Sequence, residues 1–179
     1  MLNKKEELLT NAAKIIYEEG IQKLTMDYLA KKSNITKGGV LYHFESKGNL
    51  LLQMNEMAIK KFENAWSHYR SQLSGDSLFT RAYAFATLDF LKNPETALLP
   101  AVFISSLEDE KSYKLWQETS NQWEQGFQND SGDEKSKLKL RLICDGIWFS
   151  ILYTSDNSLN KQMESLVLEY CQSSKKENI

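Results

Sequence analysis

The residues from 36 to 47 combine small, basic and aromatic side chains at a spacing suited to contact with nucleic acid. Thr36 is a favourable N-cap for a short helix. Within that helix Val40, Leu41 and Phe44 fall at helical spacing and are predicted to pack inward. The outward positions would then be Lys37, Gly38, Gly39, Tyr42 and His43. Such a surface is what a helix needs to read a DNA groove.

Two adjacent glycines in a helix require an explanation, because each costs about 1 kcal/mol relative to alanine. Without a Cβ, the first helical turn can approach base edges and phosphates closely, and its unpaired N–H groups favour negative charge. Lys37 adds a cation, and Tyr42 and His43 can donate hydrogen bonds to phosphate oxygens. Lys47 begins the following helix, whose positive end adds to its charge. The alternative, glycines that only allow close helix packing, explains less of the pattern.

The whole segment resembles the helix-turn-helix of the TetR family of bacterial repressors. In this sequence the pattern stands as Thr36-Lys37-Gly38-Gly39-Val40-Leu41-Tyr42-His43-Phe44, followed by Ser46-Lys47. Upstream, Thr25 is predicted to cap the first helix of the motif, and Asn34 with Ile35 to end it. The residues that the resemblance and this chemistry assign to DNA binding are Thr25, Thr36, Lys37, Gly38, Gly39, Val40, Tyr42, His43 and Lys47.

The periodicity of apolar residues predicts helices throughout, and the resemblance implies an all-α fold of about nine helices. A helix over 3–20 is expected to end at Gly20, and Ser46 is expected to cap a long helix reaching residue 73. Five later helices are predicted over 76–91, 95–107, 112–128, 135–155 and 158–172. The predicted divisions are a DNA-binding helix-turn-helix domain (1–47), a long linking helix (48–74) and a ligand-binding and dimerisation domain (75–179).

The helix predicted over 135–155 is apolar on nearly all sides, so it is expected to be covered on both. A second subunit would supply one cover, with the last helix completing a four-helix bundle across a two-fold axis. The resemblance implies such a homodimer, which would read a palindromic operator. The predicted dimer interface comprises Leu140, Ile143, Ile147, Ile151, Leu159, Met163, Leu166, Val167 and Tyr170.

The C-terminal half is rich in aromatic residues, most of which are expected to fill its core. Asp145 is an exception, because an unpaired acid would be costly to bury in LRLICDGIWFSIL. Either it bonds a neighbouring helix, or it faces a cavity with Trp148 and attracts a cationic ligand. The Asp-Gly-Ile-Trp segment resembles repressors of multidrug efflux genes that respond to cationic, aromatic compounds. The predicted ligand-binding residues are Trp66, Phe103, Trp116, Asp145, Trp148 and Phe149.

Charge and composition limit the alternatives. Residues 1–64 carry ten lysines against eight acids, whereas residues 65–179 carry twelve basic and sixteen acidic residues. This distribution favours DNA contact by the N-terminal part alone. With only two histidines and without catalytic motifs, an enzyme is disfavoured. No cofactor or metal is expected.

The expected function is a ligand-responsive repressor, released from its operator by a small-molecule inducer. The alternative is a ligand-independent architectural DNA-binding protein. The chain begins without an apolar signal region, and no apolar run is long enough to span a bilayer. Its two cysteines are few for a disulfide framework. A cytoplasmic location and no membrane partner are therefore predicted.

Overall fold

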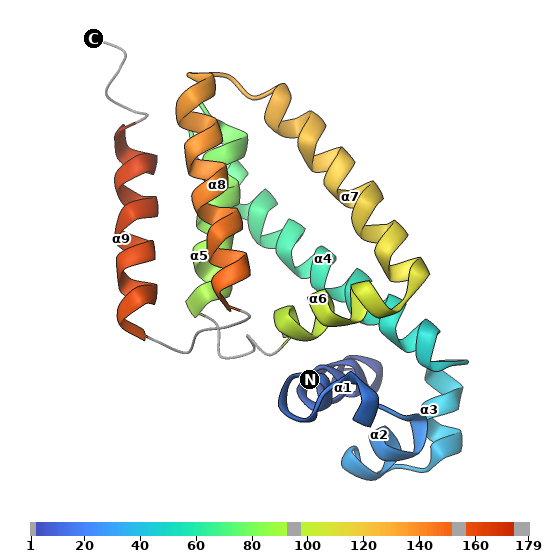
Figure 1. The fold of residues 1–179 in the computed structure, drawn as a ribbon. Helices are drawn as coiled ribbons and strands as arrows, with labels where there is room; N and C mark the ends of the chain where they lie inside the picture. The colour runs from blue at the N-terminus through green and yellow to red at the C-terminus, as the bar shows by residue number, and fades with distance from the viewer. Residues whose placement is uncertain (1–2, 93–97, 152–156, 174–179) are drawn as a thin grey trace. The chain divides into compact units, whose positions relative to one another are not determined.

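The computed structural model describes residues 3–92, 98–151 and 157–173, with side chains for all of these except 99, 100, 151, 157–160 and 173. The described residues form nine α-helices and one 3₁₀ turn (Figure 1). In chain order they are α1 (Lys4–Glu19), η1 (Ile21–Lys23), α2 (Met26–Lys32), α3 (Lys37–His43), α4 (Lys47–Gln72), α5 (Leu78–Lys92), α6 (Leu98–Glu108), α7 (Glu110–Gln128), α8 (Glu134–Ile151) and α9 (Asn157–Ser173). The predicted all-α fold is confirmed.

Several predicted helix ends are confirmed by their capping hydrogen bonds. Gly20 ends α1 with a positive φ of 89°, and its N–H donates to the Ile16 carbonyl. The Ser46 hydroxyl accepts from Asn49 N at 3.1 Å, which caps α4. The predicted helix start at residue 95 and the predicted helix end at residue 155 lie outside the described residues. Local chemistry was therefore sufficient to place these described ends within about two residues.

The contacts divide the chain into two compact units, each with its own core. Unit 1 comprises residues 1–60 and 94–119, and unit 2 comprises residues 61–93 and 120–179. Two helices contribute to both units, because α4 and α7 each run through a division between them. The divisions predicted at residues 47/48 and 74/75 separate functions, whereas these units separate groups of residues that pack together. The functional divisions remain a proposal.

Unit 1 places the helix-turn-helix on a core that also includes α6. Helix α1 packs against α6, and α2 packs against α3. The shared core contains residues from α1, α2, α3, α4 and α6, among them Leu8, Ala12, Ile16, Leu29, Val40, Phe44, Leu50, Met54 and Val102. Because these side chains are almost fully buried, the outer surface of α3 is held by a well-packed base.

A buried polar network crosses the core of unit 1. Asn55 on α4 is fully buried; its side-chain amide nitrogen donates to the Ser105 hydroxyl on α6 at 3.0 Å. Its carbonyl oxygen accepts from the indole nitrogen of Trp116 on α7 at 2.7 Å. The Trp116 ring stacks on Phe103 with 6.0 Å between centroids. These hydrogen bonds fix α4, α6 and α7 in one register, since a buried polar group without a partner is costly.

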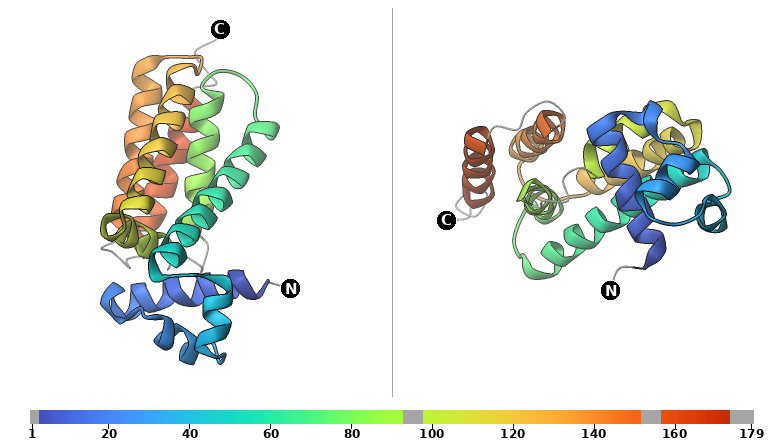
Figure 2. Two further views of the ribbon diagram at one scale, coloured as in Figure 1. Left: turned by 90° about the vertical axis from the view of Figure 1, so that its right-hand side faces the viewer. Right: turned by 90° about the horizontal axis from the view of Figure 1, so that it is seen from below.

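Unit 2 is built on α5, α8 and α9, which lie side by side (Figures 1 and 2). Phe62 occupies the centre of an aromatic cluster with centroid distances of 5.2–5.7 Å to its neighbours. Those neighbours are Trp66, Tyr83, Phe90, Trp123 and Trp148. The centre of the unit 2 core is thus made of aromatic rings in edge-to-face or tilted contacts. Aromatic pairs prefer these arrangements to a face-to-face stack.

The turn between α7 and α8 caps α5. The Asp130 carboxylate accepts from Phe79 N at 3.0 Å and from both the backbone nitrogen and the hydroxyl of Thr80 at 2.8 Å. It therefore satisfies backbone donors at the N-terminus of α5 that the helix itself leaves unpaired. This arrangement brings the end of α7, the start of α8 and the start of α5 together. Among the described helices, none is sufficiently long and apolar to cross a membrane.

The Asn55 network leads to a first prediction. Asn55→Ala should lower the free energy of unfolding by about 2–3 kcal/mol, because the Trp116 indole N–H would lose the Asn55 oxygen and the buried hydrogen bond from Asn55 to Ser105 would be lost. Urea unfolding followed by circular dichroism measures this. Asn64→Ala, an exposed substitution on the same helix, is the matched control and should change stability by less than about 0.5 kcal/mol. Equal effects of the two substitutions would contradict the role given to the network.

Candidate nucleic-acid interface and small-molecule cleft

Helix α3 is fixed at both ends by the residues that the sequence singled out. The Thr36 hydroxyl accepts from Gly39 N at 3.0 Å, and the Thr25 hydroxyl caps α2 by accepting from Tyr28 N at 3.1 Å. Between the two helices Asn34 has a positive φ of 53°, which makes the turn tight. Phe44 is fully buried below α3. The sequence-predicted motif is therefore present as two capped helices on a common core.

The outer surface of α3 presents the predicted contact residues to solvent. Tyr42 is 86% exposed, and Lys37 and Gly38 are exposed as well. His43 is half-buried, and its ring meets that of Tyr42 edge-on at 5.1 Å. A Cβ added at Gly38 would meet only the Thr36 hydroxyl, at an ordinary 3.8 Å. The packing of the chain itself therefore does not require glycine at position 38.

Two of the predicted phosphate-binding lysines already have partners within the chain. Lys37 forms an ion pair with Asp27 at 2.8 Å, and both side chains are more than half exposed. Lys47 donates to the backbone carbonyl of Ile21 at 2.9 Å, so it also tethers the η1 turn to α4. Neither partner was predicted from the sequence. An exposed ion pair contributes about 0–1 kcal/mol, so Lys37 can exchange Asp27 for a phosphate.

Two assignments for α3 require correction. Val40, predicted as both a core residue and a DNA contact, is fully buried, so its side chain cannot reach a groove. Leu41, predicted to pack inward, is 40% exposed. The reason is that in this seven-residue helix only one narrow stripe, formed by Val40 and continued by Phe44, faces the core.

The six residues predicted to bind a ligand are divided between the two units. Phe103 and Trp116 belong to unit 1, where they stack on one another. The other four belong to unit 2, but Trp66 is buried among aromatic rings and Phe149 is 64% exposed. Trp148 packs on Phe62 and Phe90. Helical periodicity alone could not separate these roles.

Asp145 is neither fully buried nor unpaired. Its side chain is 45% exposed, accepts from the Tyr83 hydroxyl at 2.8 Å, and lies 3.6 Å from Arg141 Nε. Partial burial raises the pKa of Asp145, although the Tyr83 hydrogen bond and Arg141 oppose this. Burial also raises the pKa of Tyr83 well above its usual value, which keeps its hydroxyl protonated as a donor. The acid therefore bonds a neighbouring helix, the simpler of the two alternatives.

The predicted dimer residues lie largely on the inner face of unit 2. Leu140, Ile147 and Val167 are at most 2% exposed within a single chain, so they cannot also form a subunit interface. Ile143, Met163 and Tyr170 are half-buried, whereas Leu166 is 41% exposed. The side chains of Ile151 and Leu159 lie outside the described residues. The correction arises because α5 and α9 cover the face of α8 that was assigned to a partner.

The opposite face of α8 is the exposed apolar one. Leu138, Leu142 and Phe149 are 55–64% exposed and lie at positions i, i+4 and i+11, which share one side of a helix. Gly146, also exposed, lies between Leu142 and Phe149, and a Cβ there would meet no atom within 4 Å. We call Leu138, Leu142, Gly146 and Phe149 the outer stripe of α8.

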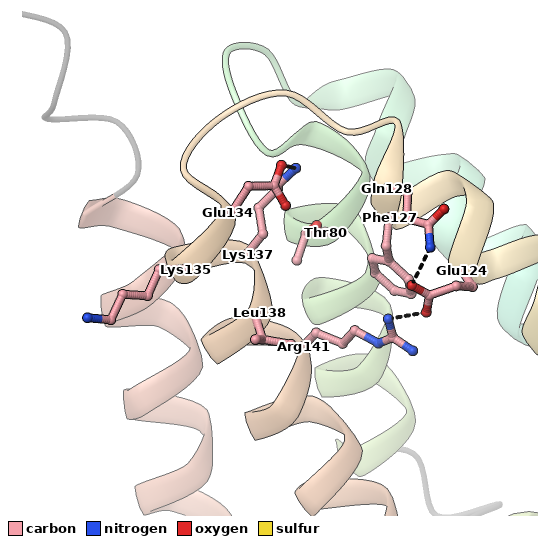
Figure 3. A pocket seen from close by; sticks show the side chains of 9 residues that line it. All are labelled: Thr80, Glu124, Phe127, Gln128, Glu134, Lys135, Lys137, Leu138 and Arg141. Atoms are coloured by element: carbon pink, nitrogen blue, oxygen red, sulfur yellow. Dashed lines mark hydrogen bonds and ion pairs between the residues drawn. The ribbon is translucent and has the colours of Figure 1, made fainter.

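A cleft of about 410 Å³ opens in unit 2 where α5, α7 and α8 meet (Figure 3). Its lining consists of Thr80, Glu124, Phe127, Gln128, Glu134, Lys135, Lys137, Leu138 and Arg141. The volume lies within the usual range for small-molecule sites, about 300–1,000 Å³. None of these residues was predicted as a ligand contact, because the helix predicted over 135–155 was interpreted as a dimer helix apart from Asp145, Trp148 and Phe149.

Two ion pairs dominate the lining. Arg141 binds the Glu124 carboxylate, and its guanidinium also lies 4.5 Å above the Phe127 ring (Figure 3). The Arg141 hydrogen bond lowers the pKa of Glu124. Lys137 binds Glu134 at 2.7 Å and donates to the Asp130 carbonyl. A sequence signal for this site existed: Lys137 and Arg141 are like charges four residues apart on one helix, an arrangement that needs compensating partners.

The glycine in the first turn of α3 gives a second prediction. Gly38→Ala should leave stability unchanged or raise it by up to about 1 kcal/mol, because alanine favours the helix and has room. Affinity for the specific DNA site should fall, since the added methyl faces the groove. Thermal unfolding and fluorescence anisotropy on a labelled duplex measure the two effects. If Gly38→Ala is more stable than the unmutated protein and binds the specific DNA site equally well, the proposed close approach of α3 to DNA is contradicted.

The Asp27–Lys37 pair gives a third prediction. Lys37→Met should weaken binding to all duplexes and flatten the slope of log affinity against log salt by about one unit. Asp27→Asn should strengthen binding to non-specific DNA, because it releases Lys37 and removes a negative charge. When Lys37 is already replaced by Met, the gain in affinity for non-specific DNA from Asp27→Asn should be smaller. The difference measures the part of the gain that comes from releasing the lysine, and the remainder comes from removing the negative charge. A gain of the same size in both backgrounds would contradict the exchange.

Comparison with known proteins agrees with both units. Residues 8–54 match the family described as bacterial regulatory proteins, tetR family, and residues 78–169 match the tetracyclin repressor-like C-terminal domain. The biofilm operon icaADBC HTH-type negative transcriptional regulator IcaR of Staphylococcus aureus (strain Newman) is 29% identical over 83 residues. That match spans 45% of this chain and 45% of IcaR, so the aligned part is less than half of either protein.

Solved structures share the fold at low sequence identity. A transcriptional regulator from Rhodococcus sp. Rha1 superposes with a TM-score of 0.70 at 15% identity, covering 96% of each chain. The multidrug binding protein EbrR, solved with imidazole, gives a TM-score of 0.60 at 15% identity, covering 95% of this chain and 96% of EbrR. The match of both units to family descriptions, together with this shared fold, shows that the chain belongs to the TetR family of bacterial regulatory proteins.

Proposed function

We propose that the protein is a cytoplasmic repressor that binds a palindromic operator as a homodimer and leaves it when a small molecule binds unit 2. The observation that carries DNA binding is the first turn of α3, where exposed glycine and lysine stand above a fully buried base. Thr36, through its cap, and Tyr42, through its exposure, are positioned to contact phosphates. The negative regulator IcaR, similar over its matched part, supports repression rather than activation.

The homodimer is proposed to form through the outer stripe of α8 in place of the face predicted from sequence. Exposed leucine and phenylalanine side chains on one helical face are unfavourable in water, at about 25 cal/mol per Å² of apolar surface. A second copy would cover them with its own stripe, and Gly146 would allow the two helices to approach closely. Leu166 on α9 is a further exposed apolar residue available to such an interface.

Ligand response is supported by the cleft of unit 2. EbrR, which shares the fold, is a multidrug binding protein solved with imidazole and with malachite green. For this chain the proposal rests on the cleft volume and on its mixture of apolar and charged side chains. The cationic inducer suggested by Asp145 has weaker support, since Tyr83 and Arg141 already partner that carboxylate.

A gel shift on a palindromic duplex tests the function as a whole. A repressor of this kind should bind the palindrome more tightly than a scrambled duplex, and a cleft ligand should release it. The alternative, an architectural DNA-binding protein, would bind both duplexes similarly and respond to no small molecule. Candidate operators are the palindromes upstream of the gene itself and of its neighbours, and binding selection from a random pool supplies an independent source.

The dimer gives a fourth prediction. Leu142→Glu should produce a folded monomer, because this residue is 60% exposed within the chain and the new charge would be buried only at a subunit interface. Gln122→Glu, which places the same carboxylate at an exposed position of α7, is the control and should remain dimeric. Light scattering with circular dichroism measures both. Operator affinity should fall with dissociation, and a dimeric Leu142→Glu variant would refute this interface.

A further inference from the structure

We propose that the cleft of unit 2 recognises an organic carboxylate, whose anionic group takes the place of the chain's own acids beside Arg141 and Lys137. Binding itself stands on the geometry of the cleft, whereas its effect on DNA rests on the proposed function. In each of the two ion pairs drawn in Figure 3, the cation and the acid are held differently by the rest of the chain. In each pair the cation is held by the fold, and the acid is the exchangeable partner.

The cations are held in place by contacts besides their acids. The Lys137 side chain is only 5% exposed, and its ammonium also donates to the Asp130 carbonyl. The Arg141 side chain is 30% exposed; its guanidinium stacks over Phe127 and lies 3.6 Å from the Asp145 carboxylate. Loss of one carboxylate would therefore leave both cations in position, ready for another anion.

The acids are held weakly. Glu134 is 83% exposed and has Lys137 as its ion-pair partner, whereas Glu124 is 42% exposed and bonds Arg141 and Gln128. An ion pair with an exposed member contributes little to stability, so a ligand carboxylate can displace either acid into water at small cost. A ligand cation would have to displace Lys137 or Arg141 instead, which are better anchored. The asymmetry thus favours an anion.

The remaining lining suggests the rest of the ligand. Phe127 and Leu138 offer apolar surface beside the two cations, and Lys135 points away from the other labelled side chains (Figure 3). A cleft of about 410 Å³ is large enough for an aromatic or branched aliphatic group. The ligand class is therefore a monocarboxylate with an apolar body. Charge-assisted hydrogen bonds would orient it.

The test compares two probes of equal shape and opposite charge, 2-naphthoate and 2-naphthylmethylamine. Isothermal titration calorimetry of the full chain without DNA should show saturable binding of 2-naphthoate, and binding of the amine that is at least about tenfold weaker. Octanoate against octylamine repeats the comparison with an aliphatic body. Equal or tighter binding of the amines, or no binding of either carboxylate, would overturn the proposal.

The direction in which single substitutions change the affinity for carboxylates gives a second test. Glu124→Gln should tighten carboxylate binding severalfold, because it removes the competing anion, whereas a cation site would lose affinity. Arg141→Met should weaken carboxylate binding by roughly tenfold or more, and Arg141→Lys should restore part of it. Glu169→Gln, at an exposed position of α9, is the control for removal of an acid and should change nothing. Circular dichroism confirms that each variant is folded.

DNA release is measured separately, which distinguishes the two possible failures. Carboxylate binding with the predicted effects of Glu124→Gln and Arg141→Met, but without release of the operator duplex, would support the site and refute ligand-responsive repression by it. Release of DNA by the amine probes alone, abolished by Asp145→Asn, would support ligand response and refute the carboxylate site.

Discussion

The structure depends on one constraint: helix α4 must contribute to two hydrophobic cores at once. Its 26 residues are continuous, so the helix is about 39 Å long. Leu50 and Met54 belong to the core that supports the DNA-binding helices, whereas Phe62 and Trp66 belong to the aromatic core of unit 2. Neither core can repack freely without affecting the apolar face of the same helix. A continuous helix that carries buried residues of both cores is thus a direct physical link between them.

Helix α7 is subject to a similar constraint, and the two helices are joined. Its second half carries Glu124 and Phe127 into the cleft, and its first half carries Trp116 into the core of unit 1. Trp116, which is half-buried, donates to the fully buried Asn55 on α4 at 2.7 Å. If a ligand displaces Glu124 as we propose, it acts on α7, and we propose the Trp116–Asn55 hydrogen bond as the route from that helix to α4. Our proposal for induction requires no other connection.

Much of the fold followed from local rules. N-cap residues, glycine at helix ends and apolar periodicity placed the ends of the described helices to within about two residues, apart from the start of α6 and the end of α8, which border residues outside the described ranges. These predictions succeeded because each such residue acts on the backbone within a few positions of itself in the sequence. The surface of α3 was likewise predictable for Tyr42 and Gly38, since spacing within a short helix fixes which side chains point away from the core.

The errors occurred where tertiary packing decides between two plausible faces. Helix α8 is apolar on both sides, so periodicity could not tell which face α5 and α9 would cover, and three of the assigned dimer residues, Leu140, Ile147 and Val167, proved to be core. The cleft depends on Glu124 and Arg141, which are 17 residues apart and meet only after α7 and α8 pack. The Asp27 and Lys37 pair also joins two helices. The residue pattern of one helix gives no information about such contacts between helices.

The two candidate sites share a physical design. At each, a lysine or arginine is held by a carboxylate of the same chain: Asp27 beside Lys37, and Glu124 beside Arg141. Full burial of these pairs would make their separation cost about 3–5 kcal/mol and would block exchange. Complete absence of the acids would leave cations free to bind any anion. Partly exposed pairs lie between these limits, because they position the cation yet yield to a phosphate or carboxylate that makes better hydrogen bonds.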